Sequence, residues 1–301
     1  MKTILITGGS GFIGTKLSSL LLSKGYSVVV ADMSAPRITD TNLTFLKIDL
    51  SHDVLPKDYD GKIYGVIHLA GKNIFGKWTE KFKRGIYDSR IISTKNLVSA
   101  ISSWNVKPQV FITASAFGYY GDKGEKKVTE DSLPGDDFLS HVCVDWEKES
   151  KKVEEYGIRS VQIRTAHVLG NGGLLAPLFV PFKLGLGAWI GKGNAWLPWV
   201  HIDDIVAMYA FALENEKMNG PINTAAQESV RQKEFMKRFG AVHHTRVLFS
   251  IPIFMLRLVY GELANTFDNS VQMSSQKLAD LGFIHMYPNL TDALQFVIHH
   301  K

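Results

Sequence analysis

The stretch that decides the fold is Thr7-Gly8-Gly9-Ser10-Gly11-Phe12-Ile13-Gly14, close to the start of the chain. It follows a short apolar run, Thr3–Thr7, and leads into Phe12–Leu22, where apolar residues recur at helical spacing. Glycine permits a tight turn, lets backbone N–H groups approach a diphosphate, and lets a helix pack close to a strand. The positive end of the helix dipole then faces the phosphates. The stretch therefore predicts a dinucleotide-binding turn between a strand and a helix.

Short buried segments alternate with helical ones through the first half of the chain. Strands are expected at Val28–Ala31, Leu43–Ile48, Val66–Leu69, Gln109–Thr113 and Ser160–Arg164, with helices at Lys83–Ser102 and Phe138–Glu155. This alternation predicts an α/β fold, a Rossmann-like doubly wound parallel sheet with helices on both faces. Beyond Asn171 the pattern changes to loops rich in Gly and Trp. We therefore expect an NAD(P)-binding Rossmann domain over residues 1–170. A smaller substrate-binding lobe with a C-terminal helical extension is expected over residues 171–301.

Composition and charge narrow the class of protein. No apolar window is long enough to span a bilayer, and the N-terminus lacks the features of a signal peptide. The single cysteine, Cys143, excludes an internal disulfide and a cysteine-based metal cluster, which favours a cytoplasmic location. The net charge is +5, but basic residues are mixed with carboxylates, so a small anionic or sugar-like substrate is favoured over nucleic acid. We expect no membrane partner and no metal, and we leave a homodimer open.

Asp32 bears on the choice of cofactor. It ends the second predicted strand, about 20 residues beyond the glycine turn, where a carboxylate accepts hydrogen bonds from ribose hydroxyls. The same negative charge repels a 2′-phosphate, so NAD is favoured over NADP. Arg37 follows shortly after and can reach such a phosphate, which leaves NADP open.

Further motifs lie in order along nearly the whole chain. They are Val66-Ile67-His68-Leu69-Ala70-Gly71, Trp78-Thr79-Glu80, Asp88-Ser89-Arg90, Ser93-Thr94, Ala114-Ser115-Ala116-Phe117-Gly118-Tyr119-Tyr120-Gly121, Trp146-Glu147, Trp199-Val200-His201-Ile202-Asp203-Asp204, Gly261-Glu262 and Leu281-Gly282-Phe283. Together with the glycine turn they resemble an atypical subfamily of extended short-chain dehydrogenases/reductases, the epimerase family proteins, also labelled sugar-nucleotide epimerases. That subfamily carries a small C-terminal domain of unassigned role. The resemblance implies an NAD(P)-dependent epimerase or reductase that acts on a nucleotide-sugar or a small carbonyl compound.

The resemblance also implies a set of cofactor contacts. They are Gly8, Gly11, Phe12, Ile13, Gly14 and Asp32 at the first turn, Asp49 and Leu50 beside the adenine, Leu69, Ala70 and Gly71 along the pyrophosphate and ribose, Ala114 and Ser115 near the nicotinamide, and the segment Arg164–Val168 with Arg164 and His167 on its other side. Members of the subfamily often have a basic residue suited to NADP at the end of the second strand. This chain has Asp32-Met33 there.

The wider superfamily works with a serine and a Tyr-x-x-x-Lys pair on the following helix. The tyrosine is the acid/base, and the charge of the lysine lowers the tyrosine's pKa. Ser115 fits the serine, but the expected tyrosine and lysine positions hold Leu139 and Cys143. Neither side chain transfers a proton as tyrosine does, and we expect Cys143 to pack rather than react.

A second pair, Tyr119 and Lys123, has the right spacing in the wrong context. Gly121 and Gly124 predict a loop there, so the spacing does not place the two side chains on one helix face. Tyr119 or Tyr120 remains a candidate acid/base because both follow closely on the predicted strand end.

On the substrate side, Arg90 offers a guanidinium fork for a carboxylate or phosphate. We expect His201 to line the cleft and Asp203 to cap the helix that follows. The tryptophans of the second lobe suit either a wall for a ring-shaped ligand or a core; they are Trp189, Trp196 and Trp199. The alternative to an enzyme is an NAD(P)-binding regulatory module without catalysis, which the residues at positions 139 and 143 favour.

Overall fold

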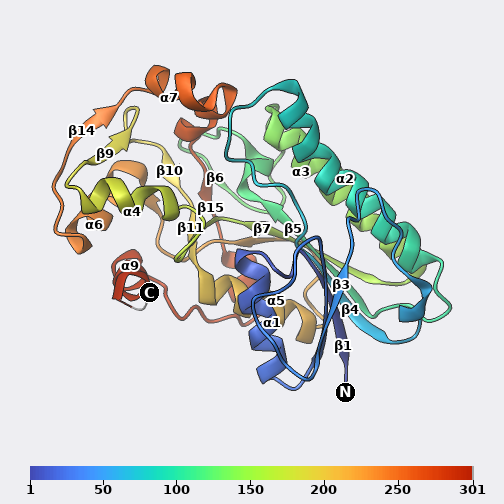
Figure 1. Ribbon diagram of the computed structural model, residues 1–301. Coiled ribbons are helices and arrows are strands. Elements are labelled where there is room, and N and C mark those ends of the chain that lie inside the picture. The colour runs from blue at the N-terminus through green and yellow to red at the C-terminus, as the bar shows by residue number, and fades with distance from the viewer. Residues whose placement is uncertain (300–301) are drawn as a thin grey trace.

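A computed structural model describes residues 1–299, and a seven-stranded parallel sheet is its centre (Figure 1). The strand order is β12-β7-β5-β4-β1-β2-β3, and every neighbouring pair is parallel. The bounds are β1 Thr3–Thr7, β2 Ser27–Asp32, β3 Leu43–Lys47, β4 Ile63–His68, β5 Val110–Ala116, β7 Arg159–Thr165 and β12 Gly220–Thr224. The predicted α/β fold with a doubly wound parallel sheet is confirmed.

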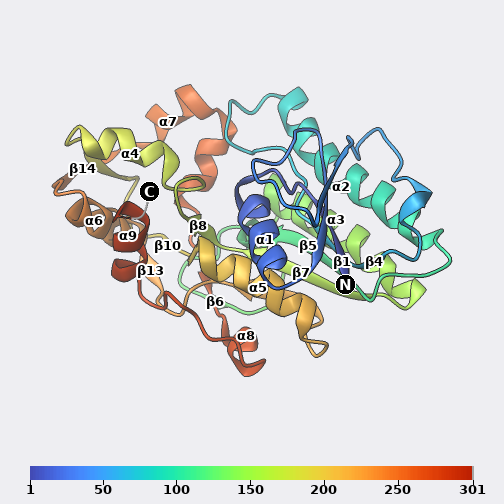
Figure 2. The same ribbon diagram turned by 60° about the horizontal axis from the view of Figure 1, so that its bottom comes forward.

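Helices cover both faces of this sheet because alternate strand residues point to opposite faces. On one face Ile4 and Ile6 of β1 share a core with Leu17 and Leu21. This face is covered by α1 Phe12–Ser23 and α5 Ile202–Glu214, which lie together in Figure 2. On the other face Leu5 packs in a separate core with apolar residues of α2. The helices of that face are α2 Glu80–Ser102 and α3 Phe138–Lys151.

Capping fixes where the helices of the second face begin. The side chain of Thr79 accepts a hydrogen bond from the backbone N–H of Phe82 at 3.2 Å, so α2 starts slightly before the predicted residue 83. Asp137 caps α3 in the same way, accepting from the backbone N–H of Ser140 at 2.8 Å. Regular α-helix ends at Lys151, and a 3-10 helix, Lys152–Tyr156, completes the predicted segment.

The later part of the chain builds a second lobe around its own apolar core. Its helices are α4 Ala176–Lys183, α6 Gln232–Val242 and α9 Leu290–His299, and their aromatic and aliphatic residues form this core, among them Phe182, Phe235, Phe239 and Leu294.

The remaining helices are α7 Ile253–Tyr260 and α8 Gln276–Asp280. Four small sheets have two strands each: β8 His167–Leu169 with β11 Trp199–His201, β9 Gly187–Ile190 with β14 Val247–Ile251, β10 Trp196–Leu197 with β13 Val230–Arg231, and β6 Lys127–Val128 with β15 Gln272–Met273. Within residues 1–299, no helix has the length and apolar character needed to cross a membrane.

Two elements after residue 170 belong to the main sheet and its covering helices, not to the second lobe. Strand β12 pairs with β7 and forms one edge of the main sheet, and α5 packs beside α1. A domain boundary at residue 170 is therefore wrong for β12 and α5. Sequence reasoning placed them in the second lobe because they follow the change of pattern along the chain. They return to the sheet because their apolar faces complete its core.

Candidate functional site

The glycine turn connects β1 to α1 under steric constraints that only glycine meets. Gly8 has a φ of +70°, and a Cβ there would lie 2.8 Å from the carbonyl carbon of Leu69 and the backbone nitrogen of Ala70. A Cβ on Gly14 would lie 2.6 Å from the Cα of Gly9. The turn thus packs directly on the end of β4, and the start of α1 packs directly on the turn. Gly11 is the N-cap of α1 and gives it no side-chain cap, so the first amides of the helix remain available to an anion.

Asp32 stands at the end of β2, beside the glycine turn. Its carboxylate accepts hydrogen bonds from the backbone N–H of Ser10 at 3.0 Å and of Ser34 at 3.3 Å. The Ser10 hydroxyl in turn donates to the Ser34 carbonyl at 2.6 Å, which holds the two loops together. Asp32 is therefore fixed at the rim of the turn and is half-buried. Its contact with a ribose stays a prediction.

The side chain of Phe12, at the start of α1, packs against the glycines that follow β8. A Cβ on Gly172 would lie 2.8 Å from the ring of Phe12, and one on Gly170 would lie 2.7 Å from it. The predicted position of Phe12 and Ile13 at the helix start is confirmed. At the end of β3, the carboxylate of Asp49 accepts from the backbone N–H of Ser51, whereas the side chain of Leu50 is buried in the core.

Arg90 lies under the loop that follows β4. Its Nη1 donates to the carbonyls of Lys72 at 3.0 Å and Ile86 at 3.2 Å, and its guanidinium lies 5.2 Å from the ring of Trp146. A Cβ on Gly71 would lie 3.1 Å from the guanidinium carbon. Burial lowers the pKa of Arg90. The structure thus gives Arg90 a role in holding the backbone of the loop next to the predicted pyrophosphate contacts, and a contact with substrate stays a prediction.

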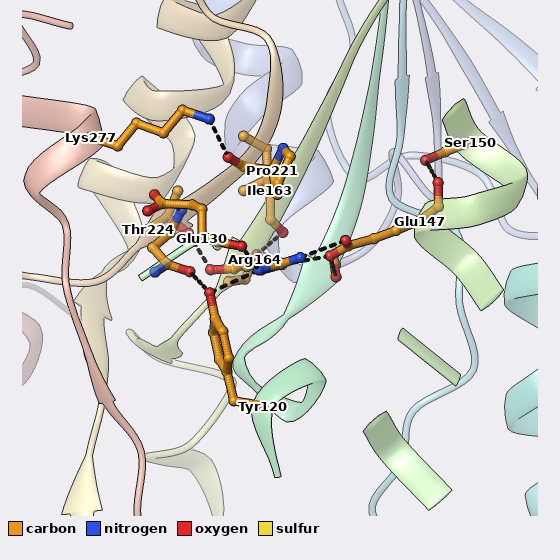
Figure 3. Close-up of polar contacts among 12 residues, drawn as sticks. Tyr120, Glu130, Glu147, Ser150, Ile163, Arg164, Pro221, Thr224 and Lys277 are labelled. Atoms are coloured by element: carbon orange, nitrogen blue, oxygen red, sulfur yellow. Dashed lines mark hydrogen bonds and ion pairs between the residues drawn. The ribbon is translucent and has the colours of Figure 1, made fainter. Parts of the chain in front are cut away.

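A buried polar cluster lies at the carboxyl ends of β5 and β7 (Figure 3). Arg164 of β7 donates from Nε and Nη2 to the two carboxylate oxygens of Glu147 in α3, at 2.8 and 2.9 Å. The hydroxyl of Ser115 donates to the same carboxylate at 2.7 Å, and Ser115 is 3% exposed. The serine predicted to be catalytic therefore has its hydroxyl hydrogen committed to a buried ion pair.

Tyr120 and Arg164 belong to this cluster and not to the surface of a cleft. The Tyr120 hydroxyl donates to Oδ1 of Asn223 at 2.6 Å and accepts from Nη1 of Arg164 at 2.9 Å. Tyr120 is fully buried, and burial raises its pKa to about 12. An acid/base role for Tyr120 is wrong, because its hydroxyl meets neither solvent nor substrate. The side chain of Arg164 likewise cannot wall a nicotinamide, because it points into the cluster.

Tyr119 and Lys123 do not share a helix face, as predicted, and Cys143 is buried, as expected of a packing residue. Tyr119 lies in a 3-10 helix, Phe117–Tyr120, and Lys123 lies beyond its end and donates to the Pro134 carbonyl at 3.2 Å. Leu139 and Cys143 face that 3-10 helix, and the burial of Cys143 raises the pKa of its thiol to about 12. Tyr119 is half-buried, and the Arg164 guanidinium lies 3.5 Å from its ring centre.

Two predicted substrate residues are buried instead. Trp199 is 1% exposed and donates from its indole to the Glu228 carbonyl at 2.9 Å, so it is a core residue. His201 is the N-cap of α5, and its Nδ1 accepts from the backbone N–H of Asp203 at 3.2 Å. Burial lowers the pKa of His201 to about 4. His201 thus caps the helix, the role predicted for Asp203, whose carboxylate instead pairs with Lys16 at 2.6 Å.

His167 lies in the segment that is predicted to line the nicotinamide, and its contact with a cofactor stays a prediction. It begins β8, is half-buried, and its ring centre lies 4.3 Å from that of Phe117 in the segment that follows β5. Burial lowers its pKa to about 4, so the ring is neutral near neutral pH. Ala114 lies in β5 beside Ser115, as predicted. In the described residues 1–299, no three His, Cys, Asp or Glu side chains gather as metal ligands would.

Comparisons with known proteins identify a family whose matched region coincides with the main sheet. The profile of the NAD-dependent epimerase/dehydratase family matches residues 4–225, from β1 to the end of the main sheet. The chain belongs to this family. A domain of unknown function matches residues 251–297, in the C-terminal lobe.

Relatives match over nearly the whole chain. The chain is 37% identical over 296 residues to the epimerase family protein YfhF of Bacillus subtilis, covering 98% of this chain and 97% of that protein. It is 32% identical to the mouse epimerase family protein SDR39U1, covering 98% and 99%. Among solved structures, human SDR39U1 with NADPH has a TM-score of 0.89 at 28% identity and covers 99% of this chain and 100% of that one. A nucleoside-diphosphate sugar epimerase of Corynebacterium glutamicum has a TM-score of 0.80 at 28% identity, and the match spans 59% of its length.

Sequence reasoning missed the central part of the buried cluster. The sequence places Glu147 in a motif without indicating its partner, and it gives no signal for Asn223. One signal was available for Glu147. It lies on the buried stripe of α3 with Cys143, Trp146 and Ser150, where a carboxylate requires a cationic partner.

Proposed function

We propose that the protein is an NAD(P)-dependent oxidoreductase of the extended short-chain type that acts on a nucleotide-sugar or a small carbonyl compound. The observation that carries the proposal is the glycine turn, which packs closely on the end of β4 and leaves the first amides of α1 without a side-chain cap. A diphosphate satisfies such amides and the positive end of the helix dipole. The NADPH in the structure of human SDR39U1, a relative of the same family, supports the same cofactor class.

The residues present fit a dinucleotide along the carboxyl edge of the sheet. Gly11 and Gly14 would hold the diphosphate, Asp32 the adenosine ribose, and the segment Leu69–Gly71, supported from below by Arg90, the path towards the nicotinamide. The nicotinamide supplies or accepts the hydride when it is bound. His167 and Phe117 would exclude water from one side of it.

The group that transfers a proton differs from the helical tyrosine of the wider superfamily. Leu139 and Cys143 occupy the usual tyrosine and lysine positions, and the Ser115 hydroxyl hydrogen is bonded to Glu147. Tyr119 is the half-buried hydroxyl that follows β5, so we assign it the exchange of a proton with the substrate oxygen. An epimerase would oxidise a carbinol to a ketone and return the hydride to the other face of that ketone, so the cofactor ends the turnover in its starting oxidation state. A reductase would transfer the hydride from the reduced cofactor to a carbonyl, release the alcohol and leave the cofactor oxidised.

Calorimetry on the ligand-stripped protein tests cofactor binding. We expect NAD to bind more tightly than NADP, because the Asp32 carboxylate accepts from a ribose 2′-hydroxyl and repels a 2′-phosphate. The variant Asp32→Ser is expected to weaken NAD binding roughly tenfold, about the free energy of one hydrogen bond to a charged group, and to narrow the gap to NADP. If NADP binds far more tightly to the unmodified chain, Asp32 does not read the ribose. If neither dinucleotide binds, the proposal fails.

A second candidate function is cofactor binding without turnover. The apolar residues Leu139 and Cys143 favour it, because they remove the pair that activates the superfamily's tyrosine. The two functions separate in a screen of nucleotide-sugars and aldehydes with two readouts. NAD(P)H absorbance detects a reductase, and chromatographic detection of the second epimer detects an epimerase, whose turnover leaves no net change in NAD(P)H. An oxidoreductase loses turnover in Tyr119→Phe and keeps it in the exposed control Tyr156→Phe. Tight binding with no hydride transfer to any compound would favour the regulatory module.

A further inference from the structure

Helix α7 presents an apolar face to solvent. Its sequence is IFMLRLVY, and none of its eight residues is buried. Phe254 and Leu258 are 67% and 79% exposed, and Met255 and Val259 are 50% and 61% exposed. Residues four apart lie on one helix face, so these four side chains form a single outward stripe. A surface helix of a soluble domain normally turns its polar face outward, and α7 does the reverse.

Two further elements with exposed apolar side chains lie at the same end of the second lobe as α7. Helix α4, strand β14 and helix α7 lie at the same end of the second lobe in both views, and β14 leads directly into α7 (Figures 1 and 2). The segment after α4 runs into β9, which pairs with β14. We call the exposed apolar side chains of these elements the lobe surface; they are Val180, Leu184, Leu186, Leu248, Phe249, Phe254, Met255, Leu258 and Val259. Exposed apolar patches of this kind on soluble proteins mark interaction sites.

The charges on the same elements are of one sign. Residues 176–190 and 245–260 contain no Asp or Glu, and their only charged side chains are Lys183, Arg246 and Arg257. Glu262, which follows α7, is itself paired with Lys83 at 3.0 Å. A partner that covers the lobe surface must therefore accept apolar side chains in its interior and offer negative charge around them.

We propose that the lobe surface binds the protein peripherally to a membrane that contains anionic lipid. A bilayer interface supplies both requirements, because acyl chains receive the apolar stripe and anionic headgroups receive the basic residues. A second copy of the chain fits less well. A symmetric contact would place Lys183, Arg246 and Arg257 of one copy against the same charges of the other. Sequence reasoning excluded a membrane partner because no segment spans a bilayer, but binding at the interface needs no span.

Vesicle flotation with the full chain tests the proposal. The probes are vesicles of phosphatidylcholine with and without phosphatidylglycerol, in low and in high salt. We expect binding to the anionic vesicles, weakened by salt because exposed charges are screened. The double variant Phe254→Ser/Leu258→Ser is expected to bind at least roughly tenfold more weakly, since two large apolar side chains no longer enter the acyl region. Lys183→Gln/Arg246→Gln is expected to weaken binding to anionic vesicles alone.

The control removes equal apolar character elsewhere. Val54→Ser/Leu133→Ser changes side chains that are 77% and 80% exposed outside the lobe surface, and it is expected to float like the unmodified chain. Thermal midpoints show that all variants are folded. Absence of binding to anionic vesicles, or equal loss in the control, overturns the proposal. So does a dimer in sedimentation equilibrium that Phe254→Ser/Leu258→Ser dissociates, since the lobe surface would then join two copies.

Discussion

Glu147→Gln tests whether the buried cluster stabilises the fold as its geometry indicates. The Glu147 and Arg164 side chains are 7% and 2% exposed, and the carboxylate accepts three hydrogen bonds, two from Arg164 and one from Ser115. The amide of glutamine keeps the shape, removes the charge, and turns one N–H group towards a donor. Two unit charges at about 4 Å interact by about 4 kcal/mol at an effective dielectric constant of about 20. Loss of one partner of a buried pair costs about 3–5 kcal/mol in measured cases. We therefore expect the free energy of unfolding to fall by about 3–5 kcal/mol.

Urea unfolding followed by circular dichroism and tryptophan fluorescence measures this loss. The matched control is Glu149→Gln on the same helix, which breaks the more exposed pair with Lys152 and is expected to cost less than about 1 kcal/mol. A second comparison removes both charges. Glu147→Leu/Arg164→Met is expected to be more stable than Glu147→Leu alone, because no uncompensated charge stays buried. If Glu147→Gln costs no more than Glu149→Gln, the cluster is not desolvated and the assignment of Tyr120 and Arg164 to a structural role loses its basis.

Three further predictions follow from single sites. Gly14→Ala places a methyl group 2.6 Å from the Cα of Gly9, so we expect it to abolish dinucleotide binding in calorimetry and to lower the free energy of unfolding by about 1–3 kcal/mol. Burial lowers the pKa of His68 from 6.5 to about 3. Between these two values His68 is protonated in the unfolded chain and neutral in the folded protein. The contribution of His68 to stability should therefore fall by about 1.4 kcal/mol per pH unit from pH 6.5 towards 3. His68→Asn should reduce the slope in urea titrations at several pH values by about that amount, and an unchanged slope would contradict the assignment. Because burial raises the pKa of Cys143 to about 12, its thiol should resist a disulfide reagent at mildly alkaline pH until the protein unfolds; rapid reaction of the native protein would show that the thiol is accessible.

Some features of the site could be predicted because they are written in local spacing. The glycine turn, Asp32 at the end of β2, and the loss of the helical Tyr-x-x-x-Lys pair at Leu139 and Cys143 depend on positions within one strand, turn or helix. The prediction that Tyr119 and Lys123 do not form a pair on one helix face is also confirmed, since the short helix ends at the glycine that follows Tyr120. In each case the backbone conformation that decides the outcome is set by residues close in the chain.

Other predictions depended on what a side chain meets. They were wrong for Tyr120 and His201, and for Trp199, which was left open between a ligand wall and a core, the structure shows the core. All three come from strand ends or from the segment after β5, where a Rossmann-like fold places its functional groups, so position along the chain favoured a cleft. Their burial arises from segments that fold back over them. Tyr120 donates a hydrogen bond to Asn223 across 103 residues of sequence, and the ring of His201 lies against that of Tyr287, with their centres 3.9 Å apart.

The sequence by itself determined the α/β layering, the glycine turn between β1 and α1, and the apolar residues Leu139 and Cys143 on α3, because hydrophobic period and glycine placement act within a few residues. Only the tertiary structure decided that Ser115 is bonded to a buried ion pair, that β12 returns to the first sheet, and that α7 turns its apolar side outward. These outcomes depend on which distant segments pack together. The free energy of that packing comes from contacts between residues far apart in the sequence, so no local pattern indicates it.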